Sequence, residues 1–88
     1  MEVVFTPGAK KDIKKLRKVS QIIILEKLKK LEVTTKGINI EKMGGFKNTF
    51  RIRVGNFRIV YRKIGDKFYV VLVGHRKDVY DRLKRLLS

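Results

Sequence analysis

Apolar and polar positions follow different periods along the chain, and each period predicts a different element. Residues 2–6 (EVVFT) form a short, apolar and β-branched run, which predicts a strand. Thr6-Pro7 then has the pattern of a helix N-cap followed by Pro at the first helical position. Apolar residues recur at i, i+4 and i+7 after it, so we expect an amphipathic helix to about Lys18, with Asp12 near its positive end.

A second helix and a loop follow. Ser20 can cap a helix whose apolar stripe is formed by Ile24, Leu28 and Leu31. Two helices with a break of one or two residues between them form a helical hairpin. The stretch 34–48 (TTKGINIEKMGGFKN) contains three glycines and has no clear period, so we expect it to be mostly loop.

Beyond the loop the period becomes two, which is typical of strands with one covered face. Residues 50–54 alternate between apolar side chains and arginine, and residues 57–62 do so again after a two-residue turn at Gly55-Asn56. A second such turn at positions 65–66 (GD) leads into residues 67–73 (KFYVVLV), which are nearly all apolar. This last run predicts a strand that is covered on both faces.

The last segment reads as a helix to the C-terminus, opened by Asp78, with Val79, Leu83 and Leu86 at i, i+4 and i+7. The predicted order is therefore βααβββα. It indicates an α+β domain: an antiparallel sheet of about four strands, made of a meander and the added N-terminal strand, with helices packed on its apolar face. A length of 88 residues allows one domain, residues 1–88.

The two-residue turns predict which side chains face one another across the sheet. The first turn places Arg53 opposite Arg58, with Arg51 one diagonal step away, and the second places Ile59 opposite Leu72. One face then collects the apolar residues that the helices should cover. They are Phe50, Ile52, Val54, Phe57, Ile59, Tyr61, Val70 and Leu72.

The opposite face carries the arginines. Like charges directly across a ladder, with β-carbons roughly 4.5–5.5 Å apart, are destabilising. Arg76 follows three residues after Val73, so we expect it to join Arg51, Arg53 and Arg58, with no acid in the surrounding strands to neutralise them. Because guanidinium groups bind phosphate in a bidentate manner, this cluster predicts an anion site. A solvated strand face is the alternative, since alternating arginines are typical of it.

Composition narrows the kind of partner. Lys and Arg total 23 against 8 for Asp and Glu, a formal net charge of +15 that opposes compaction through self-repulsion. Nucleic acid, an anionic membrane or an acidic protein could accept this charge. The electrostatics of phosphate binding favour nucleic acid.

Other compositional features exclude several classes of site. The chain has no cysteine, which excludes a disulfide scaffold, a thiolate metal site and a cysteine nucleophile, and its one histidine cannot build a zinc site. No apolar run approaches the roughly 18–20 residues of a membrane span. We also see no signal-peptide pattern at the start, so we expect a cytoplasmic protein.

Two stretches, 50–61 (FRIRVGNFRIVY) and 73–80 (VGHRKDVY), together resemble the RelE/ParE superfamily of bacterial and archaeal toxins, and the resemblance spans essentially the whole chain. It implies a RelE-like fold and a ribosome-dependent mRNA endonuclease of a type II toxin–antitoxin pair, which cuts the codon in the ribosomal A site. In that reaction the ribose 2′-OH attacks the adjacent phosphorus and leaves a cyclic phosphate and a free 5′-OH. The resemblance implies no cofactor and no metal, because the nucleophile belongs to the RNA. It also implies an acidic, RelB-like antitoxin as partner.

The resemblance also assigns roles by position. Arg51 and Arg53 match basic residues that hold the scissile phosphate, and Arg58 matches an arginine that stabilises the transition state. Arg76 matches the residue that protonates or stabilises the leaving group, and Tyr80 matches an aromatic that stacks on or aligns the base. Because arginine is a poor proton acceptor, the general base stays unassigned and charge stabilisation should dominate. RNA or ribosome contacts are further expected from Lys47, Arg62, His75 and Lys77.

Several side chains have a structural alternative. His75 is either a general acid or base or a structural residue at the strand end. Tyr80 either packs in the helix core or stacks on a base. The apolar strip on the arginine side is either covered by the C-terminal helix or forms a groove for a partner helix. Its residues are Val60, Tyr69, Val71 and Val73.

Two other functions remain open from the sequence. A ParE-like toxin would share the fold and act by binding a protein target such as DNA gyrase. A nucleic-acid-binding module without catalysis would need a stacking platform, for which the chain offers Tyr61, Tyr69 and Tyr80. For a toxin, we expect the antitoxin to inhibit by displacing the C-terminal helix or by laying acidic residues over the arginines.

Overall fold

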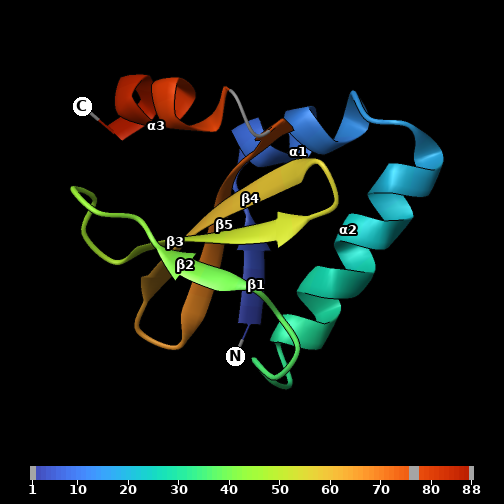
Figure 1. The fold of residues 1–88 in the computed structure, drawn as a ribbon, viewed down its shortest axis with the longest axis horizontal. Coiled ribbons are helices and arrows are strands. Elements are labelled where there is room, and N and C mark those ends of the chain that lie inside the picture. Colours follow the sequence, from blue (N-terminus) through green and yellow to red (C-terminus); the bar gives the residue numbers. More distant parts are fainter. Residues whose placement is uncertain (1, 76–77, 88) are drawn as a thin grey trace.

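The computed structural model describes residues 2–75 and 78–87, and for Tyr80 and Leu87 it describes the backbone alone. Its elements follow in the order β1 (Glu2–Phe5), α1 (Pro7–Lys14), α2 (Lys18–Leu31), β2 (Ile40–Lys42), β3 (Thr49–Val54), β4 (Phe57–Ile64), β5 (Lys67–His75) and α3 (Val79–Leu87). The strands form one five-stranded sheet in the order β1-β5-β4-β3-β2 (Figure 1). The α+β class and the βααβββα order are confirmed, with one additional strand.

That additional strand is β2, which lies in the stretch expected to be mostly loop. It is an antiparallel edge strand of three residues that pairs with β3 from Ile40↔Ile52 to Lys42↔Phe50. At the other edge β1 pairs with β5 in parallel, so the sheet is mixed and the expectation of a wholly antiparallel sheet was wrong on this pair. A three-residue strand has too little sequence to show a period, so its pairing with β3 defines it.

The helical hairpin forms with shifted boundaries. The hydroxyl of Thr6 accepts a hydrogen bond from the Ala9 amide (3.3 Å), and Pro7 occupies the first turn, which confirms the predicted cap. Helix α1 ends earlier than expected, and α2 begins at Lys18, so Ser20 lies inside the helix and does not cap it.

The first turn sets the predicted register, but the second does not. Arg53 lies opposite Arg58, as expected. On β5, however, Ile59 faces Val73 and Val60 faces Leu72, because the register shifts between Val60 and Tyr61. This β-bulge adds one residue to β5. The expected pairing of Ile59 with Leu72 was therefore wrong, and Leu72 and Val73 exchange faces.

Helices cover both faces of the sheet, which confirms the prediction that the nearly all-apolar run 67–73 is covered on both sides. The larger cluster, which we call the hairpin core, lies under α1 and α2. Its buried members are Ala9, Ile13, Ile24, Leu28, Leu31, Ile52, Val54, Ile59, Tyr61, Phe68, Val70 and Val73. The smaller cluster, the α3 core, consists of Met43, Val60, Leu72, Val79 and Leu83. Figure 1 shows α3 lying apart from α2.

The α3 core shows whether the apolar strip on the arginine side is covered by the C-terminal helix or forms an open groove. The C-terminal helix covers Val60, which is fully buried, so this part of the apolar strip is not an open groove. Val73 does not belong to this strip, because the bulge directs its side chain to the other face, where it packs in the hairpin core. Among the described helices, none has the length and apolar character needed to cross a membrane.

Candidate functional site

Three of the predicted arginines share one face of the β3–β4 hairpin, the face opposite the hairpin core. Arg53 pairs directly with Arg58, and Arg51 lies two positions earlier on β3, opposite Val60. We call these three residues the arginine face. The close cross-strand placement of like charges that the turn predicts is therefore present.

Arg58 is buried at this face and hydrogen-bonded to backbone carbonyls beside the turn. It is 7% exposed, and its Nη1 donates hydrogen bonds to the carbonyl oxygens of Phe57 (3.2 Å) and Gly55 (3.5 Å). A buried charge requires such polar partners. The short turn at Gly55, whose φ of 58° favours glycine, directs its carbonyl toward this guanidinium. Arg53, across the ladder, is exposed to solvent.

Arg51 differs from its neighbours because it has an acidic partner. Glu41 of β2 lies directly opposite Arg51, and the two side chains form an ion pair. The expectation that no acid lies in the surrounding strands was wrong, because Glu41 belongs to the stretch that was expected to be loop. Its carboxylate offsets the charge of Arg51.

Lys47 and Arg62 lie at the other end of β3 and β4. Arg62 pairs with Thr49, whose hydroxyl donates to the Lys47 carbonyl oxygen at 2.9 Å. Arg62 lies four positions after Arg58 along β4, about 13 Å at the usual strand rise. Val60, buried under α3, lies between them. These two predicted contacts therefore form a second basic location, separate from the arginine face.

His75 lies on the opposite face of the sheet from the arginines. It pairs with Phe57, and the two rings pack with centroids 4.9 Å apart. The imidazole lines a small apolar cavity of about 180 Å³ with residues of α2, among them Ile23 and Ile24. This placement favours the structural alternative for His75 over a place beside Arg58.

The remaining predicted residues are described in part. Arg76 and Lys77 lie outside the described residues. The backbone of Tyr80 lies in the first turn of α3, and the choice between packing and stacking for its side chain lies outside the description.

A stacking platform for bases is not built from Tyr61. Its side chain is 3% exposed, and its ring packs between Phe50 (5.4 Å) and Phe68 (4.7 Å) in the hairpin core. Burial raises the pKa of its hydroxyl above the usual 10.0. Tyr69 is half-buried and pairs with Arg62, away from the arginine face.

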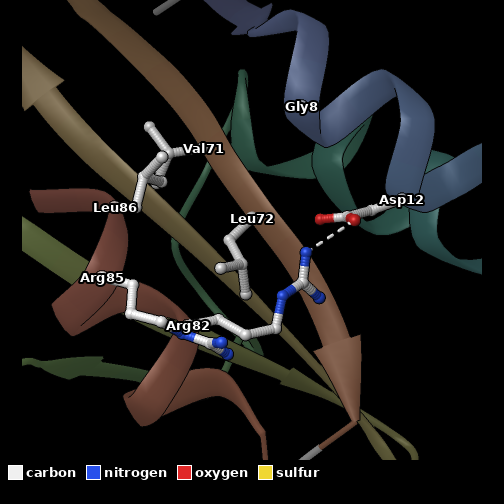
Figure 2. Close-up of a pocket in the computed structure, with 7 residues that line it drawn as sticks. All are labelled: Gly8, Asp12, Val71, Leu72, Arg82, Arg85 and Leu86. Carbon is white, nitrogen blue, oxygen red and sulfur yellow. Dashed lines mark hydrogen bonds and ion pairs between the residues drawn. The ribbon is translucent and has the colours of Figure 1, made fainter.

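Sequence reasoning missed one polar group that joins three elements. Asp12, expected near the positive end of α1, is buried. Its carboxylate accepts hydrogen bonds from the Val73 amide (3.0 Å) and from Arg82 of α3 (2.7 Å), as Figure 2 shows for the second of these. The available signal was its position on the apolar side of α1, three residues after Ala9 and directly before Ile13.

Comparison with known proteins agrees with the fold and with the two motifs. The family model described as the ParE toxin of the type II toxin–antitoxin system parDE matches residues 3–80. Toxin RelE3 of Methanocaldococcus jannaschii is 36% identical over 85 residues, which cover 92% of this chain and 97% of the relative.

Solved structures of similar fold include two complexes. A chain of the RelB–RelE antitoxin–toxin complex from Methanococcus jannaschii is 32% identical, with a TM-score of 0.70 over 90% of this chain and 96% of that chain. A chain of the intact E. coli RelBE toxin–antitoxin complex has a TM-score of 0.71 at 22% identity, over 86% of this chain and 96% of that chain. The chain therefore belongs to the RelE/ParE superfamily, the toxins of type II toxin–antitoxin systems.

Proposed function

We propose that the chain is a ribosome-dependent mRNA endonuclease that cuts within the A site by attack of the ribose 2′-OH. One observation carries the proposal: exposed Arg53 lies directly across the ladder from Arg58, which is buried and fixed by turn carbonyls. Like charges directly across a ladder repel one another. A phosphate between them would remove the repulsion and accept bidentate hydrogen bonds.

The chemistry requires cations at fixed positions. As the O2′–P bond forms and the P–O5′ bond breaks, negative charge builds on the non-bridging phosphoryl oxygens and on the leaving oxygen. Preorganised cations stabilise this charge at little cost of reorganisation. Arg58, already fixed, suits the transition state, and exposed Arg53 suits capture of the incoming phosphate. The ribosome would supply the in-line alignment of the mRNA.

Arg51 has a different place in this scheme. Because Arg51 is paired with Glu41 through one of its guanidinium nitrogens, the carboxylate competes with an RNA phosphate for this side chain. We therefore assign Arg51 to substrate holding. Arg76, Lys77 and Tyr80 keep the roles that the family resemblance gives them, namely leaving-group stabilisation, RNA contact and base alignment.

Lys47 and Arg62 suit contact with more distant RNA. They lie beyond Val60 from the arginine face, where a neighbouring stretch of mRNA or ribosomal RNA backbone would pass. The Nε atom of Arg62 is buried without a hydrogen-bond partner among the described residues.

We infer an acidic, RelB-like antitoxin as the inhibitory partner. Similar structures are RelB–RelE and RelBE complexes. A net charge of +15 favours an acidic partner, and binding stabilises a small, self-repelling domain by mass action. Such a partner would inhibit by covering the arginine face or by displacing α3.

The proposal is tested by adding the purified protein to a translating extract and mapping mRNA 5′ ends by primer extension. We expect codon-phased cuts that Arg53→Ala and Arg58→Ala reduce at least about a hundredfold, as for loss of an oxyanion donor. Lys63→Ala is the matched control, since it removes an exposed charge from the same strand. Cuts that persist in both arginine variants would contradict the proposal.

A ParE-like toxin is the second candidate, because the matching family model is that of ParE toxins. Such a toxin would leave mRNA intact and block DNA supercoiling by gyrase. The same preparation in a supercoiling assay distinguishes the two.

A further inference from the structure

Beyond Val70, side chains bond the backbone of β5 on the edge where β1 pairs with its first half. Strand β1 pairs with β5 from Lys67 to Val70. Further along, Asp12 Oδ2 accepts a hydrogen bond from the Val73 amide (3.0 Å), and Arg82 Nη1 donates one to the Val73 carbonyl oxygen (3.3 Å). One side chain from α1 and one from α3 thus satisfy both backbone groups of the same residue.

The two side chains are also joined to each other. Arg82 Nη2 lies 2.7 Å from Asp12 Oδ1, with 9% of the Asp12 side chain exposed (Figure 2). One buried carboxylate therefore connects α1, β5 and α3. We call this arrangement the Asp12–Arg82 bridge. Removing either partner would leave a buried polar group without its bond.

The bridge lies next to the arginine face. Gly74 pairs with Arg58 across the ladder. A Cβ at Gly74 would lie 3.0 Å from Arg82 Nη1 and 3.7 Å from Val79 Cγ2. The Arg82 guanidinium and the first residue of α3 therefore both pack against the strand at the position opposite Arg58.

Apolar contacts alone do not fix α3 at this position. Val79 and Leu83 are fully buried on Met43, Val60 and Leu72. Burial of this kind is non-directional. The Asp12–Arg82 bridge adds directional bonds from α3 to β5 and α1, which define where the first turn of α3 lies relative to Arg58.

We propose that Asp12 is a positioning residue for the cationic site: through Arg82 and Val73 it fixes the start of α3 beside Arg58. The inference rests on the proposed function, because the reaction it serves is the proposed RNA cleavage. Asp12 and Arg82 contact no reacting atom in this account. They act by holding the start of α3 against Gly74, the residue that pairs with Arg58 across the ladder.

The test compares Asp12→Asn, Arg82→Gln and the double variant under single-turnover conditions with mRNA programmed on ribosomes. We expect each single variant to slow cleavage about ten- to a hundredfold, while the affinity for the ribosome stays within about twofold, because misplacement by about an ångström acts on the chemical step. The double variant should be no slower than the worse single one, since both break the same bridge. Arg85→Gln is the control on the same helix and cavity.

A structural role alone predicts a different result. The variants would then lose thermal stability, while the cleavage rate per folded molecule, measured well below their melting temperatures, stayed at the wild-type value. That result, or rate effects that multiply in the double variant, would overturn the proposal.

An NMR measurement decides the inference without cleavage. The Arg58 Nε–Hε signal should shift in Asp12→Asn and in Arg82→Gln but remain in place in Arg85→Gln. An unchanged Arg58 signal in the bridge variants would contradict the positioning role. A wild-type protein that leaves mRNA intact would instead contradict the proposed function, and the NMR comparison would still decide whether Asp12 positions Arg58.

Discussion

The hairpin core and the α3 core lie on opposite faces of one sheet, and different surroundings give them different tasks. The hairpin core is the larger cluster and is closed by two helices. The α3 core is a small cluster with the arginine face on one side and Lys47 and Arg62 on the other. A chain of this size needs the first for stability. The second places a helix beside cations that repel one another, and polar bonds must hold it there.

Matched truncations should separate these tasks most clearly. Leu28→Ala in the hairpin core and Leu83→Ala in the α3 core each remove a buried leucine side chain and should each lower the free energy of unfolding by about 2–5 kcal/mol. The cleavage rate per folded molecule should fall in Leu83→Ala alone. Chemical denaturation and single-turnover cleavage at low temperature measure the two effects. Equal losses of rate in both variants would remove the distinction between the cores.

Gly74→Ala tests the contact between the arginine face and α3. The new methyl group would meet Arg82 Nη1 at 3.0 Å, and the Asp12–Arg82 bridge prevents an easy retreat. We expect a loss of about 1–3 kcal/mol in the free energy of unfolding. In an Arg82→Ala background the same substitution should have little effect, since the obstacle is gone. If Gly74→Ala lowered the free energy of unfolding equally in that background, the contact with Arg82 would not be the cause of the loss.

Glu41→Gln should sharpen the account of the arginine face. The Arg51–Glu41 pair is partly exposed, so its loss should change the free energy of unfolding by less than about 1 kcal/mol. Freed from the carboxylate, the face should bind RNA more tightly and with steeper salt dependence. Fluorescence anisotropy with a short RNA measures this, with Glu26→Gln on the exposed side of α2 as control. Equal affinities of the two variants would mean that Glu41 does not restrain Arg51.

Tyr61 gives the smallest expected effect, a pH dependence of the hairpin core. Burial raises its pKa in the folded state above 10.0, the unfolded value. Its contribution to stability is therefore complete below pH 10.0 and is lost as the pH rises through the folded-state pKa. Tyr61→Phe should flatten the fall in stability at alkaline pH relative to wild type. Parallel pH profiles for the two proteins would contradict a buried, protonated hydroxyl.

The sequence predicted the hairpin of the arginine face because turn chemistry is local. A two-residue turn at Gly55-Asn56 determines the register of β3 and β4, so the pairing of Arg53 with Arg58 followed from the residues alone. The resemblance of the two motifs to the RelE/ParE superfamily predicted the RelE-like fold. The hairpin core also followed from its period, apart from the positions on β5 beyond the bulge.

The features that the sequence did not predict depend on distant parts of the chain. The run KFYVVLV is apolar on both faces, so a bulge that shifts its register by one residue still places apolar side chains on each face. The hydrophobic pattern therefore does not indicate the bulge that exchanges the faces of Leu72 and Val73. Glu41 meets Arg51 only after β2 pairs with β3. Asp12 and Arg82 are 70 residues apart, and no local rule joins them.

Single-turnover cleavage of an mRNA with one 2′-deoxyribose at the A-site cut position tests the central claim most directly. If the RNA supplies the nucleophile and the arginine face supplies charge, the deoxy-substituted message should remain intact, while the all-ribose message is cut and leaves a 5′-OH. Cleavage of both messages at the same rate would contradict the account.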